Sequence, residues 1–217
     1  MNDRSASNSH TLKSYAKLPL ILLIIYAVLC LLSLLAPKAG RLNWLMEVAP
    51  ALIGIMVLFV TYKKFPMSRL IYWGVFIHAL ILLYGGHYTY AETPLGNWAK
   101  ELFHLSRNHY DRVGHLALGF FPALIIREVL LRKTPLRRDG WFTFIILSVI
   151  LAIGAFWELL EWWTTLLVAS DVGTAFLGTQ GDIWDAQWDM FLAIVGAAIS
   201  LLLLSKRHDR SMKLVPT

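Results

Sequence analysis

Charge and cysteine are scarce in this sequence of 217 residues. Charged residues make up 16% of the chain, against about a quarter in an average soluble domain. Cys30 is the only cysteine, which excludes an intramolecular disulfide and argues against a cysteine-based zinc site. The HExxH, P-loop, GxSxG and EF-hand patterns are also absent, so none of those enzyme or ion-binding classes is indicated.

Hydrophobic residues, by contrast, make up 57% of the chain and are collected in long blocks, which is typical of an integral membrane protein. Each block is close to the roughly 20 residues that a helix needs to cross the hydrocarbon core, and none alternates as a β-barrel strand would. We therefore predict an all-α, polytopic membrane helix bundle with six transmembrane helices. The predicted spans are 18–36, 42–62, 69–88, 112–131, 141–163 and 187–204, forming one domain over 18–204 between tails at 1–17 and 205–217.

The positive charges predict how these helices are oriented. With the N-terminus inside, 14 Lys and Arg fall on the cytoplasmic side and 5 on the opposite side, so both termini are expected to be cytoplasmic. The first block is expected to stay uncleaved, because no small-residue cleavage site follows it. Nucleic-acid binding is not expected despite the net charge of +6, since no basic face with interleaved aromatics appears. The cytoplasmic set is Arg4, Lys13, Lys17, Lys63, Lys64, Arg69, Arg132, Lys133, Arg137, Arg138, Lys206, Arg207, Arg210 and Lys213.

Acidic and imidazole side chains gather at the predicted outer ends of the spans. Ionisable groups at membrane depth are costly and usually functional. At 100° per residue, the acids of the last span share one stripe with Ala193, Gly196 and Ser200, and small residues mark close helix contact in membranes. The outer group is His87, Asp111, His115, Glu158, Glu161, Asp182, Asp185 and Asp189.

Two further spacings concentrate these groups. Asp111 and His115 are four residues apart, which allows both to bind one ion. Glu158 and Glu161 are three residues apart near a helix C-terminus, where the macrodipole disfavours negative charge. No Lys or Arg occurs between positions 138 and 206. The acids in this interval must therefore be protonated, exposed to water, paired with Arg107 or Arg112, or bound to a cation.

A divalent metal is the most economical of these solutions. Carboxylates with imidazole and no thiolate suit Mg²⁺, Mn²⁺, Fe or Zn²⁺. We predict Asp111, His115, Glu158, Asp185 and Asp189 as metal ligands, with Glu161 or His87 as a base. Asp182 can instead cap the last helix, and Glu47 is expected to pair with Arg41.

Several functions are compatible with this group. One is a metal-dependent hydrolase acting on an ester or phosphoester in a lipid or lipid-linked substrate. The second is a transporter in which the acids relay protons or bind a cation, and the third is a non-catalytic protein whose cluster only locks the bundle. Most tryptophans lie on the predicted outer side, where they form either an interfacial belt or an apolar wall for an amphiphilic substrate. Membrane lipid is an expected partner under each of the three functions.

Four segments carry a family resemblance: GGHY at 85–88, NHYDRVGH at 108–115, WELLEW at 157–162 and GDIWDAQWD at 181–189. They resemble the YjdF-type inner membrane protein family over essentially the whole chain. The resemblance implies a bacterial multi-pass inner membrane protein and leaves its activity open. Over a shorter stretch, Glu158, Asp185, Asp189 and Gly196 are similar to positions in VanZ-like membrane proteins, which implies a role near the cell-envelope face.

Overall fold

The computed structural model describes residues 2–168, 173, 176–177 and 179–216, with side chains from Tyr15 onward. Its regular elements are helices: α1 (Asn2–Leu35), α2 (Gly40–Thr61), α3 (Arg69–Tyr88), η1 (Tyr90–Glu92), α4 (Pro94–Leu102), α5 (Tyr110–Lys133), α6 (Gly140–Leu167) and α8 (Asp185–Met212). Within the described residues, all of these except η1 and α4 are long and apolar enough to cross a membrane, which makes six candidate spans. The predicted fold class is confirmed.

The helices extend beyond the predicted spans. The membrane-length part of α1 is Tyr15–Leu35, but the helix itself begins at Asn2. Residues 205–212, predicted as part of a tail, continue α8. Helical hydrogen bonding does not stop where hydrophobicity stops, because each further residue adds one backbone hydrogen bond.

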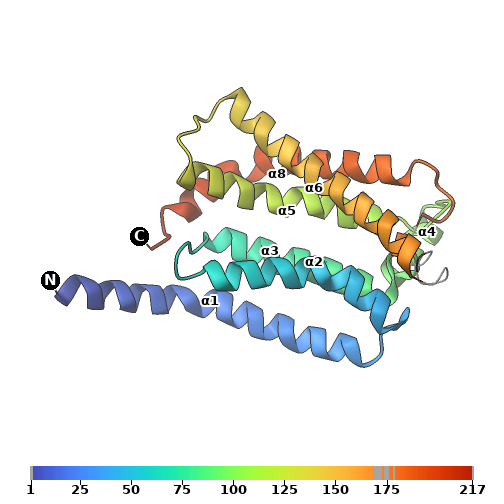
Figure 1. The fold of residues 1–217 in the computed structure, drawn as a ribbon, viewed down its shortest axis with the longest axis horizontal. Helices are drawn as coiled ribbons and strands as arrows, with labels where there is room; N and C mark the ends of the chain where they lie inside the picture. Colours follow the sequence, from blue (N-terminus) through green and yellow to red (C-terminus); the bar gives the residue numbers. More distant parts are fainter. Residues whose placement is uncertain (1, 169–172, 174–175, 178, 217) are drawn as a thin grey trace.

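The bundle consists of two groups of helices (Figure 1). In one group, α1 and α2 both pack on α3; in the other, α5 and α6 both pack on α8. The contact of α3 with α5 joins the two groups. We call the end where α4 lies and where α5 and α8 begin the α4 end. The C-terminus lies at the opposite end (Figure 1).

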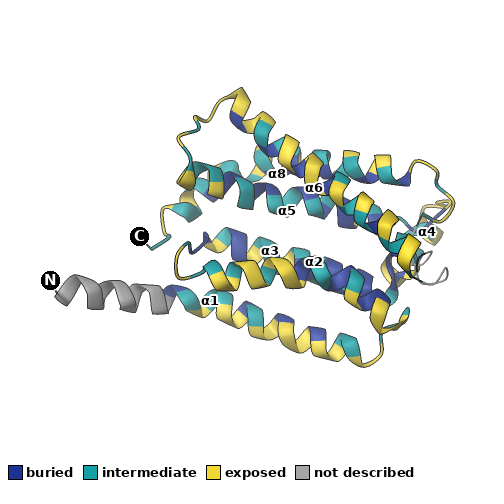
Figure 2. Ribbon diagram, in the orientation of Figure 1, coloured by how far each residue is buried: buried dark blue, intermediate teal, exposed yellow. Residues whose placement is uncertain are grey.

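The outward faces of the helices are apolar. Figure 2 shows exposed residues along the outer sides of α1, α2 and α6, and buried residues between the helices. Large side chains such as Leu31, Phe59 and Leu202 are mostly exposed. Exposed apolar helix faces of this length suit lipid tails, which solvate leucine as well as a protein core does.

The closest helix contact is between α5 and α8. A Cβ atom added at Gly119 would overlap the carbonyl oxygen of Ala193, and one added at Gly196 would overlap that of Leu116. Ala193, Gly196 and Ser200 are all buried on this face of α8. The prediction that the small-residue stripe is a packing face is confirmed. This contact fixes the spacing of the two helices that begin beside the outer acids.

Gly119→Ala is expected to destabilise the protein by about 1–3 kcal/mol, the usual cost of overpacking, because the added methyl group must push α8 away. Thermal unfolding of the purified protein in detergent micelles measures this change. Gly54→Ala is the matched control, since no atom lies within 4 Å of its added Cβ, and its stability should be unchanged or slightly higher. Equal melting temperatures for the two variants would contradict the close contact.

Candidate metal centre

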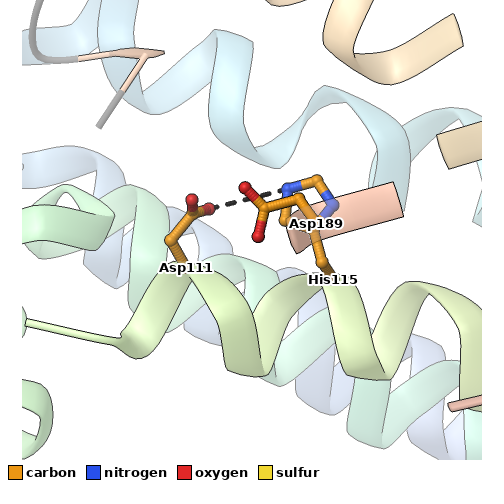
Figure 3. A group of neighbouring side chains, drawn as sticks. All are labelled: Asp111, His115 and Asp189. Atoms are coloured by element: carbon orange, nitrogen blue, oxygen red, sulfur yellow. Dashed lines mark ion pairs between the residues drawn. The ribbon is translucent and has the colours of Figure 1, made fainter. Parts of the chain in front are cut away.

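Three potential metal ligands meet at the α4 end (Figure 3). Asp111 and His115 lie one turn apart on α5, and Asp189 reaches them from α8. One ligand atom from each lies within 4.8 Å of the other two, and all three residues are buried. His115 Nε2 is 3.7 Å from Asp111 Oδ1, which is too long for a hydrogen bond. Donors bound to one ion at 2.0–2.2 Å stand roughly 3.0–3.6 Å apart, so the group is close to the required size.

Helix α6 adds two carboxylates to this group. Glu158 Oε1 lies 3.6 Å from His115 Nε2. Glu161, one turn further along α6, is buried and lies within electrostatic range of Asp111 and Glu158. The three helices thus bring together five of the residues that the sequence predicted near one site.

Several atoms of this group have no hydrogen-bond partner among the described residues. They are Asp189 Oδ1, Glu158 Oε1 and His115 Nδ1. Asp189 is only 1% exposed. A buried polar atom without a partner costs about 1–3 kcal/mol, so three of them in one place indicate a ligand or ordered water there.

The other two aspartates pair with arginine instead. Arg107 NH1 donates to Asp185 Oδ1 at 2.5 Å, and Arg112 NH2 donates to Asp182 Oδ2 at 2.6 Å. Asp182 Oδ1 also accepts from the backbone N–H of Trp184 at 3.0 Å. Asp185, predicted as a metal ligand, therefore lies in an ion pair with Arg107, outside the group of three ligands.

The arginines are positioned by a loop interaction that the sequence analysis missed. The Asn108 backbone donates to Gln180 Oε1 at 3.0 Å, and Gln180 Nε2 donates back to the Asn108 carbonyl at 2.8 Å. The Asn108 side chain donates to Thr93 O and to Asn97 Oδ1. These bonds tie the loop before α5 to α4 and to the segment before α8. Gln180 and Gly181 both have positive φ, a turn that places Asp182 opposite Arg112.

Comparison with known protein families matches residues 18–210 to the family described as "Predicted membrane protein (DUF2238)". The chain belongs to this family. It is also 43% identical over 173 residues to "Inner membrane protein YjdF" of Escherichia coli (strain K12), which covers 80% of this chain and 82% of that protein. No solved structure matches. The predicted family resemblance is confirmed, and the chain is a multi-pass inner membrane protein whose family description assigns no activity.

One predicted member of the outer group, His87, pairs with helix α1 instead. The ring of His87 hydrogen-bonds with Ser33 of α1, through the hydroxyl at 3.1 Å and the carbonyl at 3.2 Å, and Trp44 also donates to the Ser33 hydroxyl. His87, predicted as a possible base, therefore ties α3 to α1. The predicted Glu47–Arg41 pair is wrong, because Glu47 is buried with Oε1 unpartnered while Arg41 is exposed.

The loop histidine His109 is outside the spans. Burial, together with the positive charges of Arg112 and Arg107, lowers its pKa. The charged form of His109 is therefore disfavoured.

A second polar network lies at the opposite end of the bundle, and the sequence analysis missed it. Glu128 is 0% exposed and accepts from the Ser68 backbone at 2.9 Å, Arg132 at 2.6 Å and His208 Nε2 at 2.9 Å. Arg127 donates to His208 Nδ1 and to Asp209. Glu128 lies inside the predicted span 112–131, and an acid at that depth was the signal that could have revealed the network.

Proposed function

We propose that this chain is a metal-dependent membrane enzyme in which Asp111, His115 and Asp189 hold a divalent cation, with Glu158 as a fourth ligand. The observation that carries the proposal is the meeting of three buried ligand groups within 4.8 Å, with Asp189 Oδ1 unpartnered. The donor set of carboxylates and one imidazole suits Zn²⁺, Mn²⁺, Mg²⁺ or Fe.

A comparison of the two ends of the bundle supports a bound cation at the α4 end. There, the buried Glu128 carboxylate is met by a backbone N–H, an arginine and a histidine. At the α4 end, Arg107 and Arg112 are engaged by Asp185 and Asp182. The carboxylates of Asp111, Glu158 and Asp189 therefore need another positive charge, because buried like charges without a counter-ion are strongly destabilising.

The reaction that fits this centre is hydrolysis. A divalent cation held by these ligands would supply Lewis-acid activation of water. Glu161 would accept the proton of the water that attacks the carbonyl carbon or phosphorus of an ester, and would return that proton to the leaving oxygen when its bond breaks. Glu161 suits this role because it lies beside Asp111 and Glu158 without belonging to the group of three ligands.

The surroundings favour a lipid or lipid-linked substrate. Trp98, Trp184 and Trp188 are exposed at the α4 end, and the Arg112 guanidinium lies 5.3 Å from the Trp188 ring centroid. The aromatic rings offer apolar contact at the membrane surface.

Transport is less well supported. Glu128 and His208 at one end are separated from Asp189 at the other by the α5–α8 contact, where Gly119 meets Ala193 and Gly196 meets Leu116. Backbone-to-backbone packing leaves no room for an ion or a water chain along this face.

We further infer that the α4 end faces the periplasm, because 14 Lys and Arg flank the helices at the other end and positive charge is retained on the cytoplasmic side. Reporter fusions after residues 66, 136 and 210 are expected to show a cytoplasmic location, and a fusion after residue 100 a periplasmic one. A periplasmic signal from residue 136 would reverse the topology and place the metal centre in the cytoplasm.

Glu161→Gln is expected to keep the bound metal and lower turnover by about 10²–10⁴-fold, the usual contribution of a general base. The assay incubates the metal-loaded protein, reconstituted in bilayers, with inner-membrane lipid extract and measures hydrolysis products by mass spectrometry. Glu101→Gln, an exposed acid at the same end, should behave as wild type. Absence of products with metal-loaded wild type, or equal turnover by Glu161→Gln, would contradict the hydrolase.

A further inference from the structure

Asn43 and Glu47 form a second unsatisfied polar pair, on α2. They are four residues apart, so both side chains leave the same face of the helix. Asn43 is 1% exposed and Glu47 is 4% exposed. Both polar atoms of the Asn43 side chain and Glu47 Oε1 have no partner at hydrogen-bond distance among the described residues, although Asn43 lies near enough to stabilise the Glu47 carboxylate. A side-chain amide and a carboxylate rarely lack partners at membrane depth, because burying each of them without a hydrogen bond or a bound ligand costs several kcal/mol.

Close helix contacts bring Glu47 within electrostatic range of Asp111. Glu47 Cβ would lie 3.1 Å from a Cβ added at Gly86 of α3, so α2 and α3 touch at this point. The Tyr90 ring fills the space between Gly85 of α3 and Gly114 of α5. Asp111 is three residues before Gly114 and therefore shares its helix face.

The charges around Tyr90 agree with this placement. Tyr90 lies outside the spans, and its pKa is raised well above the ordinary value by burial first and then by Glu47, Tyr110, Asp111 and Glu161. Glu47 and Asp111 also act on each other electrostatically. The carboxylate on α2 and the carboxylates on α5 and α6 thus surround one phenol, and Asp111 is common to both groups.

We propose that Glu47 and Asn43 hold a second divalent cation, bridged by Asp111 to the first. This inference rests on the proposed function, since the bridging carboxylate belongs to the first ion's ligand set. Carboxylate and amide oxygens are ligands that Mg²⁺ and Mn²⁺ prefer. Paired ions in such sites stand roughly 3.5–4 Å apart and share bridging ligands.

A second ion narrows the substrate class to a phosphoester. Two cations at this spacing stabilise both the attacking and the leaving oxygen of an in-line displacement at phosphorus. Glu161 would accept the proton of the attacking water, and a cation held by Glu47 and Asn43 would neutralise the departing oxygen.

Mn²⁺ binding followed by electron paramagnetic resonance tests this pair of ions. The full-length protein in detergent micelles is stripped of metal, titrated with Mn²⁺ alone, and compared with Glu47→Gln, Asn43→Leu and the control Glu101→Gln. We expect wild type and control to bind about two ions per chain with an exchange-coupled spectrum. Glu47→Gln and Asn43→Leu should keep one ion with an uncoupled spectrum.

Each other result overturns a different claim. One uncoupled ion in wild type overturns the second site and leaves the first. A coupled pair that survives in both Glu47→Gln and Asn43→Leu overturns the ligand assignment. Failure of wild type to bind any Mn²⁺ overturns both the second site and the proposed function. If the two variants do not fold, Asn43→Asp preserves an oxygen donor and is expected to retain the coupled pair.

Discussion

Glu128→Ala is expected to destabilise the protein by about 3–5 kcal/mol, the usual cost of breaking a buried ion pair from one side. The change removes the acceptor of the Ser68 backbone N–H, Arg132 and His208. His208 lies fully buried, so its ring cannot replace the lost partner with water. Unfolding in mixed micelles, followed by circular dichroism, measures the loss.

The control for this variant is Glu92→Ala, because Glu92 is exposed. This substitution should lower the free energy of unfolding by less than about 0.5 kcal/mol. Metal content should remain that of wild type in Glu128→Ala, since Glu128 lies at the end of α5 opposite Asp111. A stability loss no larger than that of the control would mean that the network does not hold α3, α5 and α8 together.

Asp189→Asn is expected to abolish stoichiometric metal binding and the stabilisation that comes with it. A ligand present at 1,000 times its dissociation constant stabilises the folded state by about 4.1 kcal/mol, which corresponds to a melting-temperature shift on the order of 10 °C for a chain of this size. The variant should melt at the temperature of chelated wild type. Added metal should not raise that temperature.

Asp182→Asn is the matched control, because it makes the same chemical change at the same end of α8. Asp182 accepts from Arg112 and does not belong to the group of three ligands, so this variant should retain its metal. Equal metal loss from both variants would mean that the α4 end responds to any lost charge, and the assignment of Asp189 as a ligand would fail.

The helices and the face that each presents could be predicted because hydrophobic length and helical period act locally. The periodicity of α8 places Asp189 on the stripe of Ala193 and Gly196, and that stripe packs against α5. The four-residue spacing of Asp111 and His115 similarly places them together once α5 is a helix. These predictions need no knowledge of any loop.

The partners of individual charges could not be predicted, because loops determine them. Asp185 and Asp189 lie one turn apart on α8, yet Asp185 meets Arg107 and Asp189 meets the ligand group. That difference arises from the Asn108–Gln180 contact and the positive φ of Gln180. Neither leaves a periodic signal in the sequence.

The network at the opposite end was missed for a related reason. His208 follows a run of basic residues and was assigned to a solvated tail, but α8 continues through it and carries it to Glu128. Glu47 was assigned to Arg41 because the two are close in sequence. In the helix, six residues do not return to the same face, and Glu47 points into the bundle instead.

Metal content of the purified full-length protein, measured together with its melting temperature before and after chelation, tests the central claim most directly. We expect at least about one divalent ion per chain to co-purify, and we expect chelation to lower the melting temperature until the same metal is added back. Protein that is free of metal, and that melts unchanged with and without added Zn²⁺, Mn²⁺ or Mg²⁺, would contradict it.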